Sequence, residues 1–326
     1  MLTQKRRSPF FVGFVKYVGL VDLVDRVGFS LSSLKGVISV SVVSIVALFS
    51  ASSTAMAEAS APFLLVNARA YIPADLKVQY VYAPSIIYSQ GAYHSYYCST
   101  PSGGSVKGGM DFIRYSSSAN LVNWTAPSLM LQPSNLDSER SACDPSVVRF
   151  NAGDGLYYYM FYSGNAKGVQ TVNFVARSVS PTGPFLKYTD RGTWEQAPRD
   201  PHVITYPFYA GGEDGSGIYG AGEPSVVVRD GALYMWYTDT TASSNKKTPQ
   251  VYLRTSWDGI NWSNAQATNV SNYSIDVKYD RVRGLFVMFE IPHMHQKESK
   301  LIARTSKDGT NWSPPQTVGG KNCFPD

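Results

Sequence analysis

Four stretches of the chain contain similar short motifs in the same order, and this internal repeat limits the possible folds more than any other feature. Each stretch opens with an apolar or β-branched run. The runs begin at Tyr82, Cys143, Gly222 and Ser274. A turn and a second, aromatic run follow, and the turns contain Gln90-Gly91, Asp154-Gly155, Asp230-Gly231 and Arg283-Gly284. Short apolar runs joined by glycine-containing turns are typical of β-hairpins.

Two further elements complete every repeat. The third run ends in a serine in all four stretches, at Ser116, Ser178, Ser256 and Ser306. An aromatic residue then closes the repeat, at Trp124, Phe185, Trp262 and Trp312. A hairpin, a third strand, a turn and an aromatic fourth strand form the pattern of a propeller blade. We therefore predict an all-β fold, a β-propeller that forms a single domain over residues 58–326.

The length of the chain indicates five blades, although four are legible in the repeat. At roughly 50 residues per blade, residues 58–326 are long enough for five. The sequence leaves open where the fifth blade lies. Its strands could come from Pro62 to Tyr80, from the surplus between Tyr188 and Tyr219, or from both ends of the chain together.

The N-terminal region has the pattern of an export signal. The apolar run from Gly36 to Phe49 is shorter than the roughly 20 residues of a membrane-spanning helix, and Ala55-Met56-Ala57 resembles a signal peptidase site. We expect residues 1–57 to be a signal peptide with a long leader. The mature chain should then be secreted or periplasmic, without stable membrane association after cleavage.

The charge of the chain argues against nucleic-acid binding, and its cysteine content allows one disulfide. Outside residues 1–57, basic and acidic residues are nearly equal in number, so the chain lacks the basic face that nucleic-acid binding requires. An oxidising compartment would let Cys98, Cys143 and Cys323 form one disulfide and leave one thiol over. The spacing of these cysteines does not show which pair forms.

The repeat predicts that carboxylates gather at the propeller axis. The first strand of a blade lies innermost, and the equivalent position reads Ala83, Asp144, Glu223 and Asp276. Crowding and burial raise the pKa of one carboxyl while a neighbour stays ionised. That division of roles is what hydrolysis of a glycosidic bond needs. One such residue alone is readily explained as a turn cap, but three at one blade position favour a shared catalytic site with Glu223 as the acid.

Other residues are weaker candidates for substrate binding. Trp194 and Trp257 lie outside the register of the repeat, and we predict that they stack on sugar. Arg140 precedes Asp144 and could either pair with the axial carboxylates or bind a substrate hydroxyl. His293 and His295 share a face of a strand, but no third ligand accompanies them, so we predict no metal site there.

The words of the repeat resemble those of the five-bladed propeller glycosidases, in particular glycoside hydrolase family 43. The likeness runs from Tyr82 to Trp312. Its motifs are Tyr82-Ala-Pro-Ser, Asp144-Pro-Ser-Val-Val, Glu223-Pro and the element SSSANLVNW that ends at Trp124. The resemblance implies that Glu223 is the general acid, that Asp144 orients it, and that the anomeric centre is inverted. It demands no cofactor, and a calcium ion in the funnel would be in keeping with it.

One motif of that family is absent from this sequence. The family's general base lies on an Asp-Pro word before the Ala-Pro word, and no such word precedes Tyr82 in the mature chain. Asp75 is the nearest upstream carboxylate. Asp276 is the other contender, because a closed ring brings the last blade beside the first.

The sequence therefore predicts an exported glycoside hydrolase that acts on a pentose-containing or related polysaccharide or oligosaccharide, with Asp276 or Asp144 as base. We expect a monomer whose partner is its carbohydrate substrate. Two alternatives stay open: a catalytically silent propeller that binds a glycan, and a transglycosylase of the same superfamily.

Overall fold

The computed structural model describes residues 81–100, 111–134, 138–165, 170–208, 219–241, 249–291 and 301–318. In these ranges every named element is a β-strand, and the strands form four sheets. No helix among these residues is long and apolar enough to cross a membrane. The predicted signal peptide, Pro62 to Tyr80, Asp75, both residues of the His293 and His295 pair, and Cys323 lie outside the described residues.

Each sheet is an antiparallel meander. The first has the order β1-β2-β3-β4, and the second has the order β5-β6-β7-β8-β9 with β10 also paired to β7. The third and fourth have the orders β11-β12-β13-β14 and β15-β16-β17-β18. The bounds in the first two sheets are β1 (Val81–Ser89), β2 (Ala92–Ser99), β3 (Phe112–Ser118), β4 (Ser128–Leu131), β5 (Cys143–Asn151), β6 (Leu156–Gly164), β7 (Val172–Ser178), β8 (Leu186–Tyr188), β9 (Trp194–Glu195) and β10 (Val203–Thr205). Those in the last two are β11 (Ala221–Arg229), β12 (Ala232–Asp239), β13 (Gln250–Ser256), β14 (Gln266–Ala267), β15 (Ile275–Asp280), β16 (Leu285–Glu290), β17 (Ile302–Ser306) and β18 (Gln316–Thr317).

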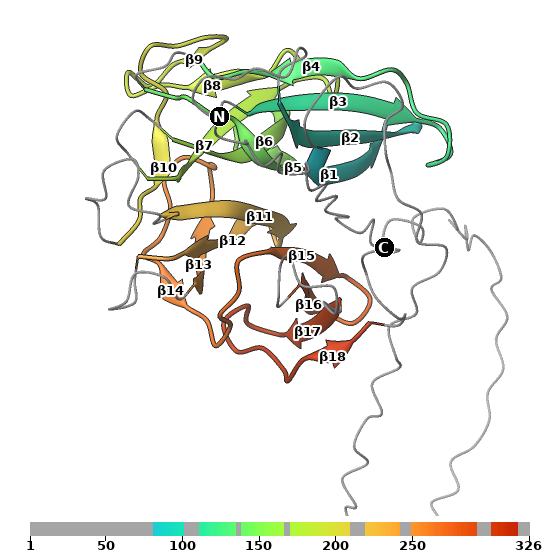
Figure 1. Ribbon diagram of the computed structural model, residues 1–326, viewed down its shortest axis with the longest axis vertical. Coiled ribbons are helices and arrows are strands. Elements are labelled where there is room, and N and C mark those ends of the chain that lie inside the picture. The colour runs from blue at the N-terminus through green and yellow to red at the C-terminus, as the bar shows by residue number, and fades with distance from the viewer. Residues whose placement is uncertain are drawn as a thin grey trace, which may run out of the picture.

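The four sheets are arranged around a common centre, with β1, β5, β11 and β15 as the inner strands and β4, β9, β14 and β18 toward the periphery (Figure 1). Contacts join β1 to β5, β5 to β11, and β11 to β15. This arrangement confirms the predicted all-β propeller, with four blades described.

The hairpin turns are those predicted from the repeat. Gln90 and Asp230 have φ values of 50° and 52°, and the glycines after them have φ values of 80° and 77°. Two consecutive residues with positive φ are the mark of the type I′ turn, whose twist matches that of the strands on either side. The turn residues therefore fix the register in which β1 pairs with β2 and β11 pairs with β12.

The closing aromatic of the repeat was predicted to lie on a fourth strand, and this was wrong: Phe185 comes one residue before β8, and the tryptophans lie earlier still. Trp124, Trp262 and Trp312 lie in the turn before that strand. In each turn the indole Nε1 donates to the carbonyl oxygen three residues earlier, over 3.2, 3.2 and 3.1 Å. An apolar ring with a polar edge suits this position, because the N–H finds a partner while the ring packs on the blade.

The long connection after Tyr188 belongs to the second blade. Within it, β9 pairs with β8, and β10 pairs with the far end of β7. The described part of this surplus, up to residue 208, therefore enlarges an existing sheet and does not supply a fifth blade.

Neighbouring inner strands are joined by serine hydroxyls. In three successive blades a backbone N–H of one inner strand donates to a buried serine Oγ of the strand before it. The pairs are Val147 to Ser85 at 3.0 Å, Val226 to Ser146 at 2.9 Å, and Val277 to Ser225 at 2.8 Å. Because sheet pairing within a blade does not use these N–H groups, the serines satisfy them and hold each inner strand in register with the next.

Replacing Ser85 with alanine tests this contact. The buried N–H of Val147 would lose its acceptor, so we expect Ser85→Ala to lower the free energy of unfolding by about 1–3 kcal/mol. Urea denaturation monitored by tryptophan fluorescence measures the change. Thr317→Ala on the exposed strand β18 is the control, with an expected change within about 0.5 kcal/mol. Equal stabilities of the two variants would contradict the role given to Ser85.

Candidate functional site

Three inner strands begin with the same backbone irregularity. Ala83, Asp144 and Glu223 have φ values of 49°, 47° and 53°. Each lies where one extra residue shifts the register against the second strand of its blade. A non-glycine residue in the left-handed region costs about 1–3 kcal/mol, and both such residues and β-bulges are concentrated at functional sites. The structure thus gives these three positions the equivalence that the repeat predicted.

Asp144 and Glu223 share one environment. Burial raises the pKa of the Tyr82 hydroxyl well above its ordinary value, and the negative charges of Asp144 and Glu223 raise it further. The same three causes, in the same order, raise the pKa of Tyr219. Since both tyrosines sense both carboxylates, all four side chains belong to one cluster, which we call the carboxylate site.

Glu223 is fixed at two points. Its backbone N–H donates to Ser163 Oγ at 2.8 Å, and its Oε2 accepts a hydrogen bond from Ser274 Oγ at 3.1 Å. Gly222, just before it, lies so close to the Tyr219 hydroxyl that a side chain would clash there. The glycine therefore lets Tyr219 approach Glu223.

A disulfide lies beside Asp144. Cys98 on β2 and Cys143 on β5 are bonded, and their Cα atoms are 4.9 Å apart. The hydroxyl of Tyr82 lies 2.7 Å from Cys143 Sγ. The sequence left the pairing of the three cysteines open; the bond found here links the first two blades directly next to a residue of the carboxylate site.

Asp276 was predicted to occupy the same blade position as Asp144 and Glu223, and the structure places it elsewhere. The strand β15 lacks the extra residue and pairs regularly with β16. Val277 donates to Ser225 as Val226 does to Ser146, so Asp276 is the counterpart of those serines. Its Oδ1 accepts from Lys278 Nζ at 2.9 Å, and the residue is 6% exposed. It is therefore a buried, ion-paired carboxylate.

The predicted sugar-stacking tryptophans do not lie with the carboxylates. Trp194 is on β9 at the outer edge of the second blade, where its ring packs against Tyr159 and Tyr188. Arg177 stacks on its face, 4.2 Å from the ring centroid. Trp257 is 71% exposed, but it follows β13 beside the Gly231 turn, at the end of the blade opposite to Glu223.

Arg140 lies in the segment that leads into β5. Its backbone N–H donates to the carbonyl of Asn165 at 2.6 Å, and the side chain is half-buried. The preceding residue, Glu139, is fully buried and pairs with Lys187. The two roles predicted for Arg140, pairing with the axial carboxylates and binding a substrate hydroxyl, both stay predictions.

Asp111 is a carboxyl near this site that the sequence did not point to. It lies just before β3, and its Oδ2 accepts a hydrogen bond from Ser141 Oγ at 3.0 Å. Burial raises its pKa to about 7, and the charge of Asp144 adds to the increase. Asp111 lies outside the repeated words, so only the folded structure brings it to Asp144.

Within the described residues, no three acidic side chains gather closely enough to form a metal site by themselves. In this part of the chain one group of three possible metal ligands was found, namely Cys98, Asp111 and Cys143. The two sulfurs are joined in the disulfide, and calcium takes oxygen ligands. We therefore derive no step through a metal ion.

The raised pKa of Asp111 predicts a pH-dependent stability. A carboxyl with a folded pKa of about 7, against an ordinary value of 3.8, favours the folded state below pH 4 and loses that contribution as the pH rises to 7. Asp111→Asn removes this loss. In urea unfolding, the stability of the variant relative to the wild type should increase by about 4 kcal/mol between pH 4 and pH 8. A difference that does not change with pH would contradict the assignment.

Comparisons with known proteins bear on the fold of the chain. Residues 84–210 match the family described as Glycosyl hydrolases family 32 N-terminal domain. That range runs from within β1 to the end of the second blade and includes Asp144, but not Glu223. No curated protein sequence matches the chain.

Solved structures with the same fold cover most of the chain. A family 117 glycoside hydrolase from the marine bacterium Zobellia galactanivorans has a TM-score of 0.54 and 14% identity, over 81% of this chain and 75% of that one. An N-acetylgalactosamine deacetylase from F. plautii, in complex with blood group B trisaccharide, has a TM-score of 0.53 and 18% identity, over 80% and 76%. A thermostable family-43 glycoside hydrolase has a TM-score of 0.52 and 16% identity, over 74% and 72%. At these identities the likeness concerns the fold. The chain thus has the fold of the propeller glycoside hydrolases, and residues 84–210 carry the sequence pattern of one of their families.

Proposed function

We propose that the chain is an exported glycoside hydrolase that cleaves glycosidic bonds of a pentose-containing or related polysaccharide or oligosaccharide. The observation that carries the proposal is the carboxylate site: Asp144 and Glu223 occupy equivalent left-handed bulges on adjacent inner strands and act on the same two tyrosines. Two carboxyl groups across one glycosidic bond are the machinery that such hydrolysis requires.

In the proposed reaction Glu223 gives its proton to the glycosidic oxygen as the bond to the anomeric carbon breaks. A water molecule attacks that carbon from the opposite face, and a carboxylate accepts the proton that the water loses. Single displacement of this kind inverts the anomeric centre. We assign the proton-accepting role to Asp144, because the charge of Asp276 is already paired with Lys278.

Export is supported by the disulfide between Cys98 and Cys143. Such bonds form and persist in oxidising compartments and are rare in the cytosol. The pentose-containing substrate rests on the resemblance to family 43, whereas the match of residues 84–210 to a family 32 domain keeps fructans such as levan among the substrates to be tested.

A second function, glycan binding without hydrolysis, is favoured by one observation. Asp276, one of the predicted bases, is buried and ion-paired, and no Asp-Pro word before Tyr82 supplies another. If Asp144 only orients Glu223, the site would hold sugar but would not activate water.

Replacing Glu223 with glutamine tests the acid. Release of reducing sugar is measured on arabinan, arabinoxylan, levan and aryl glycosides with purified mature chain. We expect Glu223→Gln to lower turnover by about 10²–10⁴-fold while calorimetry still detects sugar binding. Glu195→Gln on β9, at the outer edge of the second blade, is the matched control and should keep wild-type activity. Binding by the wild type without release of sugar from any of these substrates would favour the glycan-binding function.

The base is tested by comparing two isosteric variants. Asp144→Asn should lower turnover by about 10²-fold or more, because asparagine cannot accept the proton. Asp276→Asn should retain activity within about tenfold, because it alters an ion pair with Lys278 and not the proposed base. The reverse order in steady-state assays would transfer the role of base to Asp276.

A further inference from the structure

The fourth blade contributes Ser274 to the carboxylate site. Ser274 lies just before β15, and its Oγ donates to Oε2 of Glu223 at 3.1 Å. A hydroxyl that donates to one oxygen of a carboxyl group leaves the other oxygen to carry the exchangeable proton. The contact thus distinguishes the two oxygens of Glu223.

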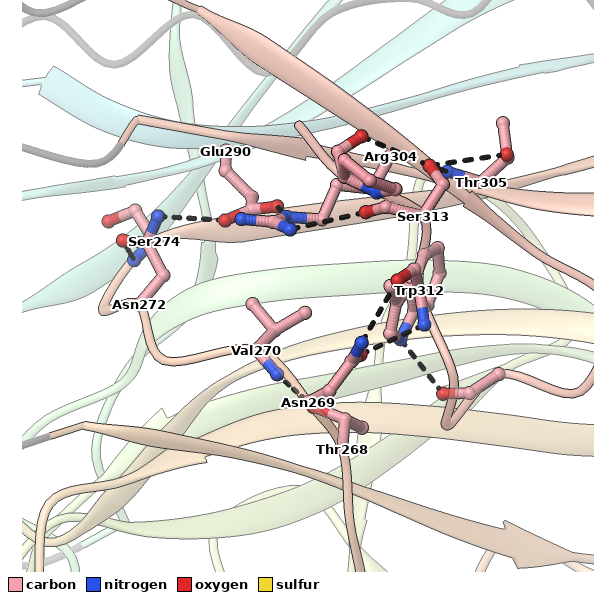
Figure 2. A network of polar contacts seen from close by, with 12 residues as sticks. Thr268, Asn269, Val270, Asn272, Ser274, Glu290, Arg304, Thr305, Trp312 and Ser313 are labelled. Atoms are coloured by element: carbon pink, nitrogen blue, oxygen red, sulfur yellow. Dashed lines mark hydrogen bonds and ion pairs between the residues drawn. The ribbon is translucent and has the colours of Figure 1, made fainter. Parts of the chain in front are cut away.

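Ser274 is itself held by a polar network in the fourth blade, shown in Figure 2. The side-chain oxygen of Asn272 accepts from the Ser274 backbone N–H at 3.3 Å, and Asn272 Nδ2 donates to Glu290 Oε2 at 3.1 Å. Arg304 Nε donates to the other oxygen of Glu290 at 2.5 Å. Asn272 and Glu290 are 5% and 2% exposed, so the network is rigid and shielded from water.

The segment is also fixed from the third blade. Thr238 Oγ1 lies 3.0 Å from the carbonyl oxygen of Asn272 and 3.1 Å from that of Tyr273, and it donates to them. Ser274 is therefore positioned by two blades, while Glu223 belongs to one of them.

We propose that Ser274 is a positioning residue, which rests on the proposed function: by donating to Oε2 it orients the Glu223 carboxyl so that Oε1 faces the glycosidic oxygen. The Arg304–Glu290–Asn272 network keeps Ser274 in place for this purpose. Among the described residues, Tyr82 and Tyr219 each feel the charges of both Glu223 and Asp144; Ser274 adds a neutral donor to this negatively charged cluster.

The test compares Ser274→Ala with Ser274→Thr, which keeps the hydroxyl, and with Ser271→Ala. Ser271 is in the same segment, but its Oγ donates to the Pro249 carbonyl at 2.6 Å and not to Glu223. The full mature chain is labelled with carbon-13 at the glutamate carboxyl carbons. The signal of Glu223 is identified by its absence in Glu223→Gln, and its titration midpoint is read by NMR.

Loss of a hydrogen bond that favours the ionised form moves the midpoint to higher pH. We expect an increase of about 0.5–1 pH unit in Ser274→Ala and wild-type midpoints in Ser274→Thr and Ser271→Ala. On a hydrolysed substrate, the basic limb of the kcat/KM profile should move by the same amount, with kcat about tenfold lower and KM within about twofold. Equal midpoints in the wild type and Ser274→Ala would overturn the proposal. The titration needs no substrate. A wild-type chain that hydrolyses none of the substrates would therefore overturn the proposed function but not the effect of Ser274 on the Glu223 midpoint.

Discussion

A serine hydroxyl that accepts a hydrogen bond from the next inner strand sets the geometry on which the rest of the structure depends. Sheet pairing organises each blade, but it does not fix one blade against another. The bonds from Val147 to Ser85 and from Val226 to Ser146 do so, together with apolar clusters that neighbouring blades share. Asp144 and Glu223 lie two residues before Ser146 and Ser225. The bonds that align the blades therefore also place the two carboxyl groups at equivalent positions along their inner strands.

The sequence was sufficient to predict the strands and turns, but not how the inner strands align with one another at the propeller axis. Hairpins, turns and four blades follow from alternating apolar runs and glycine turns, because these are local properties of the chain. The prediction aligned Asp276 with Asp144 and Glu223 by their spacing in the repeat. This was wrong because such an alignment assumes that every inner strand has the same bulge. The bulge is an extra residue in the pairing, present at Asp144 and Glu223 and absent from β15, and a repeat of similar words does not show it.

Other parts of the site depend on contacts across the fold. The pairing of Cys98 with Cys143 and the approach of Asp111 to Asp144 join residues of different blades. No spacing in the chain encodes them. Trp257 was a reasonable sugar-stacking candidate by composition, yet its place beside the Gly231 turn puts it at the wrong end of the blade. The sequence identified Asp144 and Glu223 because both stand in repeated words, and it missed Ser274 because that serine acts through the fold.

Ala83 shows what the left-handed bulge requires. It has the same φ and the same register shift as Asp144 and Glu223, but its side chain is a methyl group. The carboxylate therefore does not create the backbone conformation, and the conformation persists without it. Codons for alanine and aspartate differ by a single nucleotide. In this architecture a blade can acquire or lose an acidic group by one substitution while the backbone at that position keeps its conformation, so chemistry and local fold can evolve separately.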